Sequence, residues 1–190
     1  TLIDQDTMPQ YIMDCSFDGN SSTKFINGAG MGIDGYVGYL IESSPRKGKL
    51  RYFLNTLRAL IKYIPEPLDL YVDGTHHHFK KTYLVAMNNG KYFGGGMKVA
   101  PNASINDENL DVIVAHTISK LFILPIFLTI YLGLHVKFKK YIFITKGKHI
   151  KAKFTTPQIS QTDGETYYDV TEIEVKSTGK HIHLKSYNNK

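Results

Sequence analysis

Short runs in which apolar and polar residues alternate dominate the chain, and this pattern predicts β-strands. The runs begin with "YIMDCSF" at residues 11–17 and continue with "PLDLYVDG" and "FKKTYLVAMNN", which an Asp-Gly turn connects as a hairpin. Further strands are expected at "LDVIVAH", "KYIFITKG", "HIKAKFTT", "YDVTEIEVKS" and "HIHLKS". Short strands with frequent turns predict a mainly β fold, an antiparallel β-sandwich with one or two helices.

One stretch follows a helical period instead. In "KLRYFLNTLRALIKYI", residues 49–64, apolar residues recur at the i, i+3, i+4 and i+7 spacing of an amphipathic helix. Pro65 and Pro67 end it. Before this helix, four glycines between Gly28 and Gly35 predict tight turns and close approach of backbones.

The apolar stretch "LFILPIFLTIYLGLHV", from Leu121 to Val136, is the candidate for a membrane-spanning segment. It is short against the ~20 residues that a spanning helix needs, and it contains a proline, a glycine and a histidine. We therefore expect a buried or interfacial helix. No signal peptide is visible and the chain begins at Thr1, so we expect a single domain, residues 1–190, excised from a longer protein.

Charge and cysteine content narrow the classes of binding partner and the cellular compartment that we expect. Lys and Arg outnumber Asp and Glu by 23 to 17, and the formal charge of +6 favours polyanionic partners. The span from Val112 to Thr162 holds no acidic residue but eight lysines, which form either an ordinary solvated face or a surface for membranes or phosphate. The single cysteine, Cys15, excludes an internal disulfide and indicates a reducing compartment, most simply the cytoplasm. We expect it to be a core thiol.

The stretch "NGKYFGGGMKVAPNASINDENLD", residues 89–111, combines glycines with acidic and amide side chains. Without Cβ atoms, Gly94, Gly95 and Gly96 let another segment or a ligand phosphate come close. Asp107, Glu108 and Asp111 then offer hard oxygen ligands suited to Mg²⁺ or Ca²⁺. An Asp/Asn turn before the next strand is the simpler interpretation of the acidic part.

In a second acidic stretch, "QTDGETYYDV", Asp163 follows fifty-one residues that hold no carboxylate. Asp163 and Glu165, separated by one glycine, can project from a tight turn toward one space, where one acts as general base and the other orients it. An ordinary hairpin turn is the alternative. The three adjacent histidines of "VDGTHHHF" are not expected to bind one metal ion, because successive strand residues point to opposite faces.

The order of these segments resembles the C-terminal part of the diacylglycerol kinase catalytic family of lipid kinases. The resemblance runs from about Lys24 to about Val170 through "FINGAGMGIDGYV", "RYFLNTLRALIKYIPEPLDLYVDG", "VAMNNGKYFGGGMKVAPNASINDENLDVIV", "YLGLH" and "TDGE". Its most specific block is "NGKYFGGGMKVAPNAS". It implies a β-sandwich domain, distantly related to that of NAD kinases, which faces an N-terminal ATP-binding domain that this chain lacks.

The resemblance also implies roles for particular residues. The acidic turn would bind a structural Mg²⁺ through the side chain of Asp107 and the backbone carbonyls of Ser104 and Asn109. Here Glu108 replaces the glycine usual in the family, and Asp111 is a reserve ligand. The Asp-Gly-Glu turn is where the family has its proton acceptor, which favours Glu165 as base with Asp163 as partner. Gly94, Gly95 and Gly96 would lie near the cofactor. His135, in the segment "GLH", either contacts phosphate or is a structural histidine.

The resemblance implies that this chain is the C-terminal half of an ATP-dependent lipid kinase. It would contribute the general base for transfer of the γ-phosphoryl group to the hydroxyl of diacylglycerol or a related lipid, at the inner face of a membrane. The expected partners are the lipid surface and the chain's own N-terminal nucleotide-binding domain, with a homodimer as a further option and no nucleic acid. The isolated chain is expected to be inactive. The alternatives are an NAD kinase-like phosphotransferase domain and a non-catalytic sandwich that binds lipid or a partner.

Overall fold

The computed structural model describes residues 7–42 and 49–185, and within these ranges the protein is mainly β. The strands are β1 (Thr7–Phe17), β2 (Ser21–Phe25), β3 (Gly28–Gly32), β4 (Glu66–Val72), β5 (Thr75–Asn88), β6 (Leu110–His116), β7 (Ile142–Gly147), β8 (His149–Thr162) and β9 (Glu165–Lys185). The helices are α1 (Ile33–Glu42), α2 (Lys49–Lys62) and α3 (Lys120–Leu128), and the 3₁₀ turns are η1 (Gly94–Gly96), η2 (Thr129–Leu132) and η3 (Leu134–Lys137).

The nine strands form one antiparallel hydrogen-bonded sheet in the order β2-β1-β9-β8-β3-β5-β6-β7. β3 pairs with one end of β5 and β8, and β4 pairs with the other end of the same two strands. The sheet curls with barrel-like closure. The predicted mainly β class is therefore confirmed. The strands are continuous in one sheet, and the described residues contain three helices where one or two were expected.

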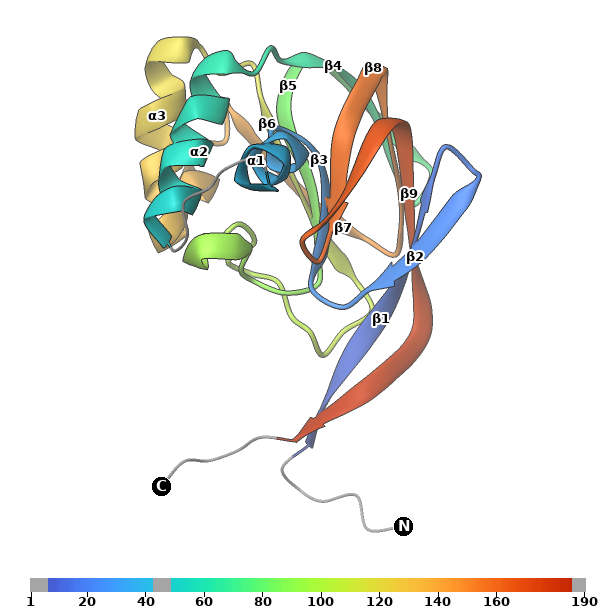
Figure 1. The fold of residues 1–190 in the computed structure, drawn as a ribbon. Helices are drawn as coiled ribbons and strands as arrows, with labels where there is room; N and C mark the ends of the chain where they lie inside the picture. The colour runs from blue at the N-terminus through green and yellow to red at the C-terminus, as the bar shows by residue number, and fades with distance from the viewer. Residues whose placement is uncertain (1–6, 43–48, 186–190) are drawn as a thin grey trace, which may run out of the picture.

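The sheet is buried on both faces at its centre, because strand residues alternate between two apolar clusters. Val85 and Met87 of β5 belong to the cluster inside the curl, whereas Ala86, between them, belongs to the cluster beneath the helices. Val112 and Ile113 of β6 divide in the same way. Figure 1 shows all three helices on one side of the sheet, so the molecule has a helical layer over one face and a core enclosed by the other.

Cys15 lies inside the curl and is buried, as expected for a core thiol. Burial raises the pKa of its thiol to about 12, so the thiolate is disfavoured at neutral pH.

The predicted helix over residues 49–64 is confirmed as α2, but α1 was not anticipated. The glycine-rich segment was expected to make tight turns, and it instead forms β3 and the first turn of α1. The reason is close packing: a Cβ atom on Gly35 would lie 2.1 Å from the carbonyl oxygen of Ile159 in β8. Gly35 therefore lets α1 lie directly on the sheet, at a distance that no larger residue permits.

The apolar stretch from Leu121 to Val136 forms α3, η2 and η3. Within the described ranges, no helix is long and apolar enough to cross a membrane. α3 buries Ile123, Ile126 and Phe127 against the sheet side and leaves other apolar residues in solvent, in keeping with the buried or interfacial helix expected.

Candidate functional site

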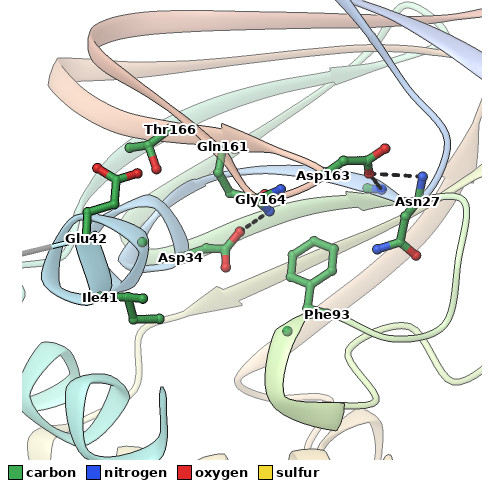
Figure 2. A pocket seen from close by; sticks show the side chains of 12 residues that line it. Asn27, Asp34, Ile41, Glu42, Phe93, Gln161, Asp163, Gly164 and Thr166 are labelled. Atoms are coloured by element: carbon green, nitrogen blue, oxygen red, sulfur yellow. Dashed lines mark hydrogen bonds between the residues drawn. The ribbon is translucent and has the colours of Figure 1, made fainter. Parts of the chain in front are cut away.

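A pocket of about 320 Å³ opens between α1, the β8–β9 turn and the segment that contains η1 (Figure 2). It is lined by Asn27, Gly28, Asp34, Gly38, Ile41, Glu42, Phe93, Gly94, Gln161, Asp163, Gly164 and Thr166. Phe93 forms one wall, and Gly28 must be small because a Cβ atom there would lie 2.4 Å from the Phe93 ring. The pocket therefore joins three segments that are distant in the sequence. Two of them, the triple-glycine segment and the Asp-Gly-Glu turn, were candidates from the sequence.

Asp163 occupies the two-residue turn between β8 and β9. Its φ of 47° and the φ of 95° at Gly164 are the left-handed pair that such a hairpin turn requires. Its carboxylate accepts the backbone N–H groups of Ile26, Asn27 and Gly28 at 2.9, 3.1 and 2.9 Å. Both carboxylate oxygens are thus engaged in holding the segment before β3 against the turn.

Two other turns repeat this arrangement. Asp18, with a φ of 48°, accepts the N–H groups of Thr171 and Glu172, and Asp73, with a φ of 47°, accepts those of Lys148 and His149. In each turn the Asp is followed by a glycine at positive φ. A carboxylate in this position is therefore a recurrent structural feature of the fold, whether or not a pocket lies beside it.

Asp34, in the first turn of α1, is the functional candidate that the sequence interpretation missed. Its Oδ2 accepts a hydrogen bond from Nε2 of Gln161 at 2.6 Å, and Oε1 of Gln161 accepts the N–H of Gly164 at 3.0 Å. Gly30 makes room for this carboxylate, because a Cβ atom there would lie 2.7 Å from Oδ2. Gln161 thus connects Asp34 to the β8–β9 turn.

Burial raises the pKa of Asp34 to about 6, although the hydrogen bond from Gln161 lowers it in part. A carboxylate with this pKa is largely ionised at neutral pH, and yet it takes up a proton more readily than an exposed aspartate. These are the properties that general-base chemistry near neutrality requires. The signal in the sequence was a lone acidic residue in the glycine-rich apolar run "GAGMGIDGYV".

Glu165 lies outside the pocket, although its neighbours Gly164 and Thr166 line it. It begins β9, where alternate residues point to opposite faces, and its Oε2 accepts a hydrogen bond from the Tyr167 hydroxyl at 3.1 Å. The turn thus brings Asp163 to the pocket and turns Glu165 away from it.

The pocket is acidic. Asp34, Glu42 and Asp163 line it, and the Glu42 carboxylate also accepts a hydrogen bond from the Tyr168 hydroxyl at 2.8 Å. Among the described lining residues there is no lysine or arginine. The hydrogen-bond donors that engage Asp34 and Asp163 are neutral, so they leave the negative charge of both carboxylates in place.

The three consecutive glycines form η1. Gly95 and Gly96 have φ angles of 72° and 83°, a left-handed conformation that favours glycine, and both are exposed. Gly94 lines the pocket. The structure therefore places one of the three glycines at the pocket and the other two on an exposed turn beside it.

The acidic loop before β6 is not part of the pocket. Oδ1 of Asp107 accepts the N–H of Asn109 at 2.8 Å, and Glu108 pairs with Lys148 at 2.6 Å. Asp111 is buried, and its Oδ2 pairs with Nζ of Lys146 at 3.0 Å. Ser104 lies on the same loop, where its hydroxyl accepts a weak 3.4 Å bond from Asn106.

This loop is nevertheless suited to a hard cation. Burial raises the pKa of Asp111, Lys146 lowers it in part, and the nearby Asp107 carboxylate raises it further. Two carboxylates that repel each other, one of them buried, offer the kind of oxygen donors that Mg²⁺ and Ca²⁺ prefer.

The histidines take other roles. His76 and His78 both contact Oδ1 of Asp69, at 2.8 and 3.0 Å, while His77 lies against the Phe143 ring. The three therefore do not converge, as the strand geometry predicted, and the described residues contain no cluster of three or more His, Cys, Asp or Glu side chains suited to a metal. His135 is buried, its Nε2–H donates to the Val99 carbonyl at 2.9 Å, and burial lowers its pKa, which favours the structural alternative.

The chain matches a known protein family over most of its length. Residues 28–181 match the family described as "YegS C-terminal NAD kinase beta sandwich-like domain", which covers most of the chain. The chain belongs to this family. The resemblance to the C-terminal part of the diacylglycerol kinase family is confirmed.

Two named proteins match this chain in sequence. A protein named diacylglycerol kinase from Mycobacterium tuberculosis is 32% identical over 103 residues, which are 54% of this chain and 33% of that protein. A diacylglycerol kinase from Bacillus subtilis is 26% identical over 163 residues, which are 84% of this chain and 52% of that protein. The chain thus spans between a third and about half of the length of these relatives.

Solved structures support the fold. A putative diacylglycerol kinase from Bacillus anthracis superposes with a TM-score of 0.67 at 22% identity, over 95% of this chain and 57% of that chain. Yeast NADH kinase in complex with NADH superposes with a TM-score of 0.54 at 15% identity, over 96% of this chain and 45% of that chain. The chain therefore has a fold that both of these solved structures share.

Proposed function

We propose that the chain is the acceptor-binding β-sandwich half of an ATP-dependent lipid kinase, and that it contributes the general base. The observation that carries this proposal is the acidic pocket, in which Asp34 has a pKa of about 6 and neutral partners fix its orientation. The acceptor would be diacylglycerol or a related lipid with a free hydroxyl, and ATP would be bound mainly by a nucleotide-binding domain.

In this reaction the lipid hydroxyl oxygen attacks the γ-phosphorus of ATP. The new oxygen–phosphorus bond forms as the bond to the bridging β–γ oxygen breaks, ADP leaves, and the hydroxyl proton passes to a carboxylate of the protein. Phosphoryl transfer needs little other covalent chemistry from the protein, because positioning and neutralisation of charge account for most of the catalysis.

Three carboxylates are candidates for the proton acceptor. The resemblance points to Glu165 or Asp163, and the geometry adds Asp34. We favour Asp34, because the oxygens of Asp163 already accept three N–H groups and Glu165 lies outside the pocket. Asp163 would then act as a positioning residue, through the Gly164 N–H that orients Gln161.

An NAD kinase-like acceptor is the second candidate, and the fold shared with yeast NADH kinase is its support. A dinucleotide carries a pyrophosphate, whereas the described lining of this pocket has three carboxylates and no cationic side chain. Bringing a pyrophosphate near uncompensated carboxylates is electrostatically unfavourable. This charge distribution favours an acceptor with an uncharged hydroxyl-bearing head, as in diacylglycerol.

We also propose a structural Mg²⁺ in the acidic loop, held by the Asp107 side chain and the carbonyls of Ser104 and Asn109, with Asp111 in reserve. Its chemistry there would be to neutralise carboxylates and fix the loop rather than to act on the substrate, since the loop does not line the pocket. Gly94, Gly95 and Gly96 remain candidates for contact with the phosphates of ATP.

The test is transfer of label from γ-labelled ATP to lipid by the complete gene product, with vesicles that contain diacylglycerol. We expect Asp34→Asn to lower kcat roughly 10²–10⁴-fold and Glu165→Gln to lower it less than about tenfold. The wild-type kcat should fall as the pH drops through about 6, because Asp34 becomes protonated. The 190-residue chain alone should give no product.

Each result that contradicts the proposal points to a different alternative. Loss of activity in Glu165→Gln with full activity in Asp34→Asn would return the base to the position that the resemblance implies. A labelled dinucleotide without labelled lipid would favour the NAD kinase-like alternative, and no product from the complete protein would leave a non-catalytic binding domain.

A further inference from the structure

α3 is an unusual surface helix because it is apolar on every side. Ile123, Ile126 and Phe127 pack against the body of the protein, and yet Leu121 is 79% exposed and Phe122 is 49% exposed. Leu124, Leu128 and, in η2, Leu132 continue the exposed side. A soluble helix of this kind normally carries charged residues on its outer face. After its first residue, α3 carries none.

The exposed apolar side continues onto α2. Nζ of Lys120 donates to the carbonyl oxygens of Leu60, Ile61 and Tyr63 at 3.2, 3.0 and 2.7 Å, which fixes the start of α3 to the end of α2. At this end of α2, Ile61 and Ile64 are 76% and 74% exposed. Figure 1 shows α2 and α3 side by side on the side of the molecule away from the β1–β9 ribbon. We call this surface the α3 face: Ile61, Ile64, Leu121, Phe122, Leu124, Leu128 and Leu132.

Lysines border the α3 face. The Phe122 ring stacks on Tyr141 at 6.4 Å between centroids, and Nζ of Lys140 lies 5.5 Å from the same Tyr141 ring. Lys137 and Lys139 are exposed on the same short segment. No acidic residue occurs in α2 or between Val112 and Thr162, so the sequence supplies no carboxylate to this border from either helix or from the segment that follows α3.

We propose that the α3 face rests on an anionic phospholipid bilayer, with α3 lying in the plane of the interface. Exposed apolar side chains next to lysines, on two helices that carry no carboxylate, match the two components of such a surface, the acyl boundary and the anionic headgroups. A nine-residue helix is too short to cross the bilayer. The inference rests on the proposed function only in that a lipid kinase must reach an acceptor held in a membrane.

The charge pattern favours a bilayer over another protein as the occupant. A contiguous apolar patch on a surface marks an interaction site of some kind. A protein partner would need acidic residues placed opposite Lys137, Lys139 and Lys140, whereas an anionic membrane presents negative charge over its entire surface. Binding should therefore depend on both the apolar residues and the lysines, and on anionic lipid.

The experiment is co-sedimentation of the purified protein with vesicles of phosphatidylcholine, with and without phosphatidylglycerol, at physiological salt and without ATP or diacylglycerol. We expect binding to the anionic vesicles and about tenfold weaker binding by the pair Leu121→Glu and Leu128→Glu. The pair Lys139→Gln and Lys140→Gln should lose most of the preference for anionic lipid.

The matched control is the pair Ile182→Glu and Leu184→Glu on β9, two exposed apolar residues on the ribbon that should not touch the bilayer. Its binding should equal that of the wild type, and thermal unfolding of every variant should show an intact fold. Absence of vesicle binding by the wild type, or an equal loss in the β9 pair, would overturn the proposal. Because this readout needs no catalysis, membrane binding without lipid kinase activity would refute the proposed function and leave this inference standing.

Discussion

The β8–β9 turn and the β4–β5 turn are built in the same way, but only the first of them lines the acidic pocket. Each has an Asp with a φ of 47° followed by a glycine at positive φ, and in each the carboxylate accepts backbone N–H groups from a distant segment. Asp73 accepts these hydrogen bonds although neither it nor Gly74 lines the acidic pocket. The shared geometry teaches that the carboxylate of Asp163 is explained by the fold alone.

What distinguishes the β8–β9 turn is its connection to α1. Gln161 precedes the turn, receives the N–H of Gly164 and donates to Asp34, which gives the buried carboxylate a fixed neutral partner. No such relay joins the Asp73 carboxylate, which accepts only N–H groups of Lys148 and His149 among the bonds described. The chemistry that is specific to the pocket therefore lies with Asp34 and Gln161 rather than with the turn itself.

The largest effect should come from removing the turn carboxylates. Asp163→Ala deletes the acceptor of three N–H groups and puts alanine at a left-handed φ, so we expect a loss of about 3 kcal/mol in the free energy of unfolding. Asp73→Ala should lose a similar amount for the same reason. Urea denaturation of both variants measures this comparison.

Asparagine substitutions are the control for these two variants, because asparagine tolerates the left-handed conformation and retains one acceptor oxygen. Both should therefore lose less than the alanine variants. If Asp163→Ala left stability unchanged while Asp73→Ala reduced it, the two turns would not be equivalent, and a direct chemical role for Asp163 would become the better explanation.

A smaller, pH-dependent effect is expected at Asp34. The folded protein holds its pKa at about 6, above the ~3.9 of an unfolded chain, so the folded state binds the proton more tightly. Its contribution to stability is complete below about pH 4 and is lost as the pH rises through about 6. Asp34→Asn should therefore gain about 2 kcal/mol relative to the wild type between pH 4 and pH 7.5.

Urea unfolding of both proteins at several pH values measures this gain. An Asp34→Asn variant that follows the wild type in parallel at every pH would show that the carboxylate is not held in a protonation-sensitive environment, and would remove Asp34 as a candidate base.

The turns and strands of this fold could be predicted from the sequence because their signals are local. Asp18, Asp73 and Asp163 each precede a glycine, and between two strand patterns this pair predicts a left-handed turn; Asp34-Gly35, which follows no such hairpin pattern, lies in α1 instead. The alternating patterns around them fixed the strands, although "YDVTEIEVKS" and "HIHLKS" proved to be one long strand, β9. The alternation of apolar and polar residues does not show whether the chain between two such patterns turns back or continues as one bent strand.

α1 and Asp34 could not be predicted from local signals. Glycine opposes helix formation by propensity, and Gly35 and Gly38 made the segment resemble a series of turns. The contact that makes Gly35 necessary is with Ile159, which lies far along the chain, and the partner of Asp34 is Gln161 on the same distant strand. Only the folded arrangement shows that this aspartate is partly buried beside a pocket, and hence that its pKa is raised.

The smallest effect concerns the acidic loop, where Glu108 and Asp111, unlike the carboxylates of the pocket, have lysine partners. Millimolar Mg²⁺ should raise the free energy of unfolding of the wild type by about 1 kcal/mol, because a cation relieves the repulsion between Asp107 and Asp111. Asp107→Asn should abolish the increase. Glu108→Gln, which removes only the partner of Lys148, should retain it. An equal increase in all three proteins, measured as thermal unfolding with and without Mg²⁺, would place the cation elsewhere and leave Lys146 as the sole counter-charge that Asp111 has among the described residues.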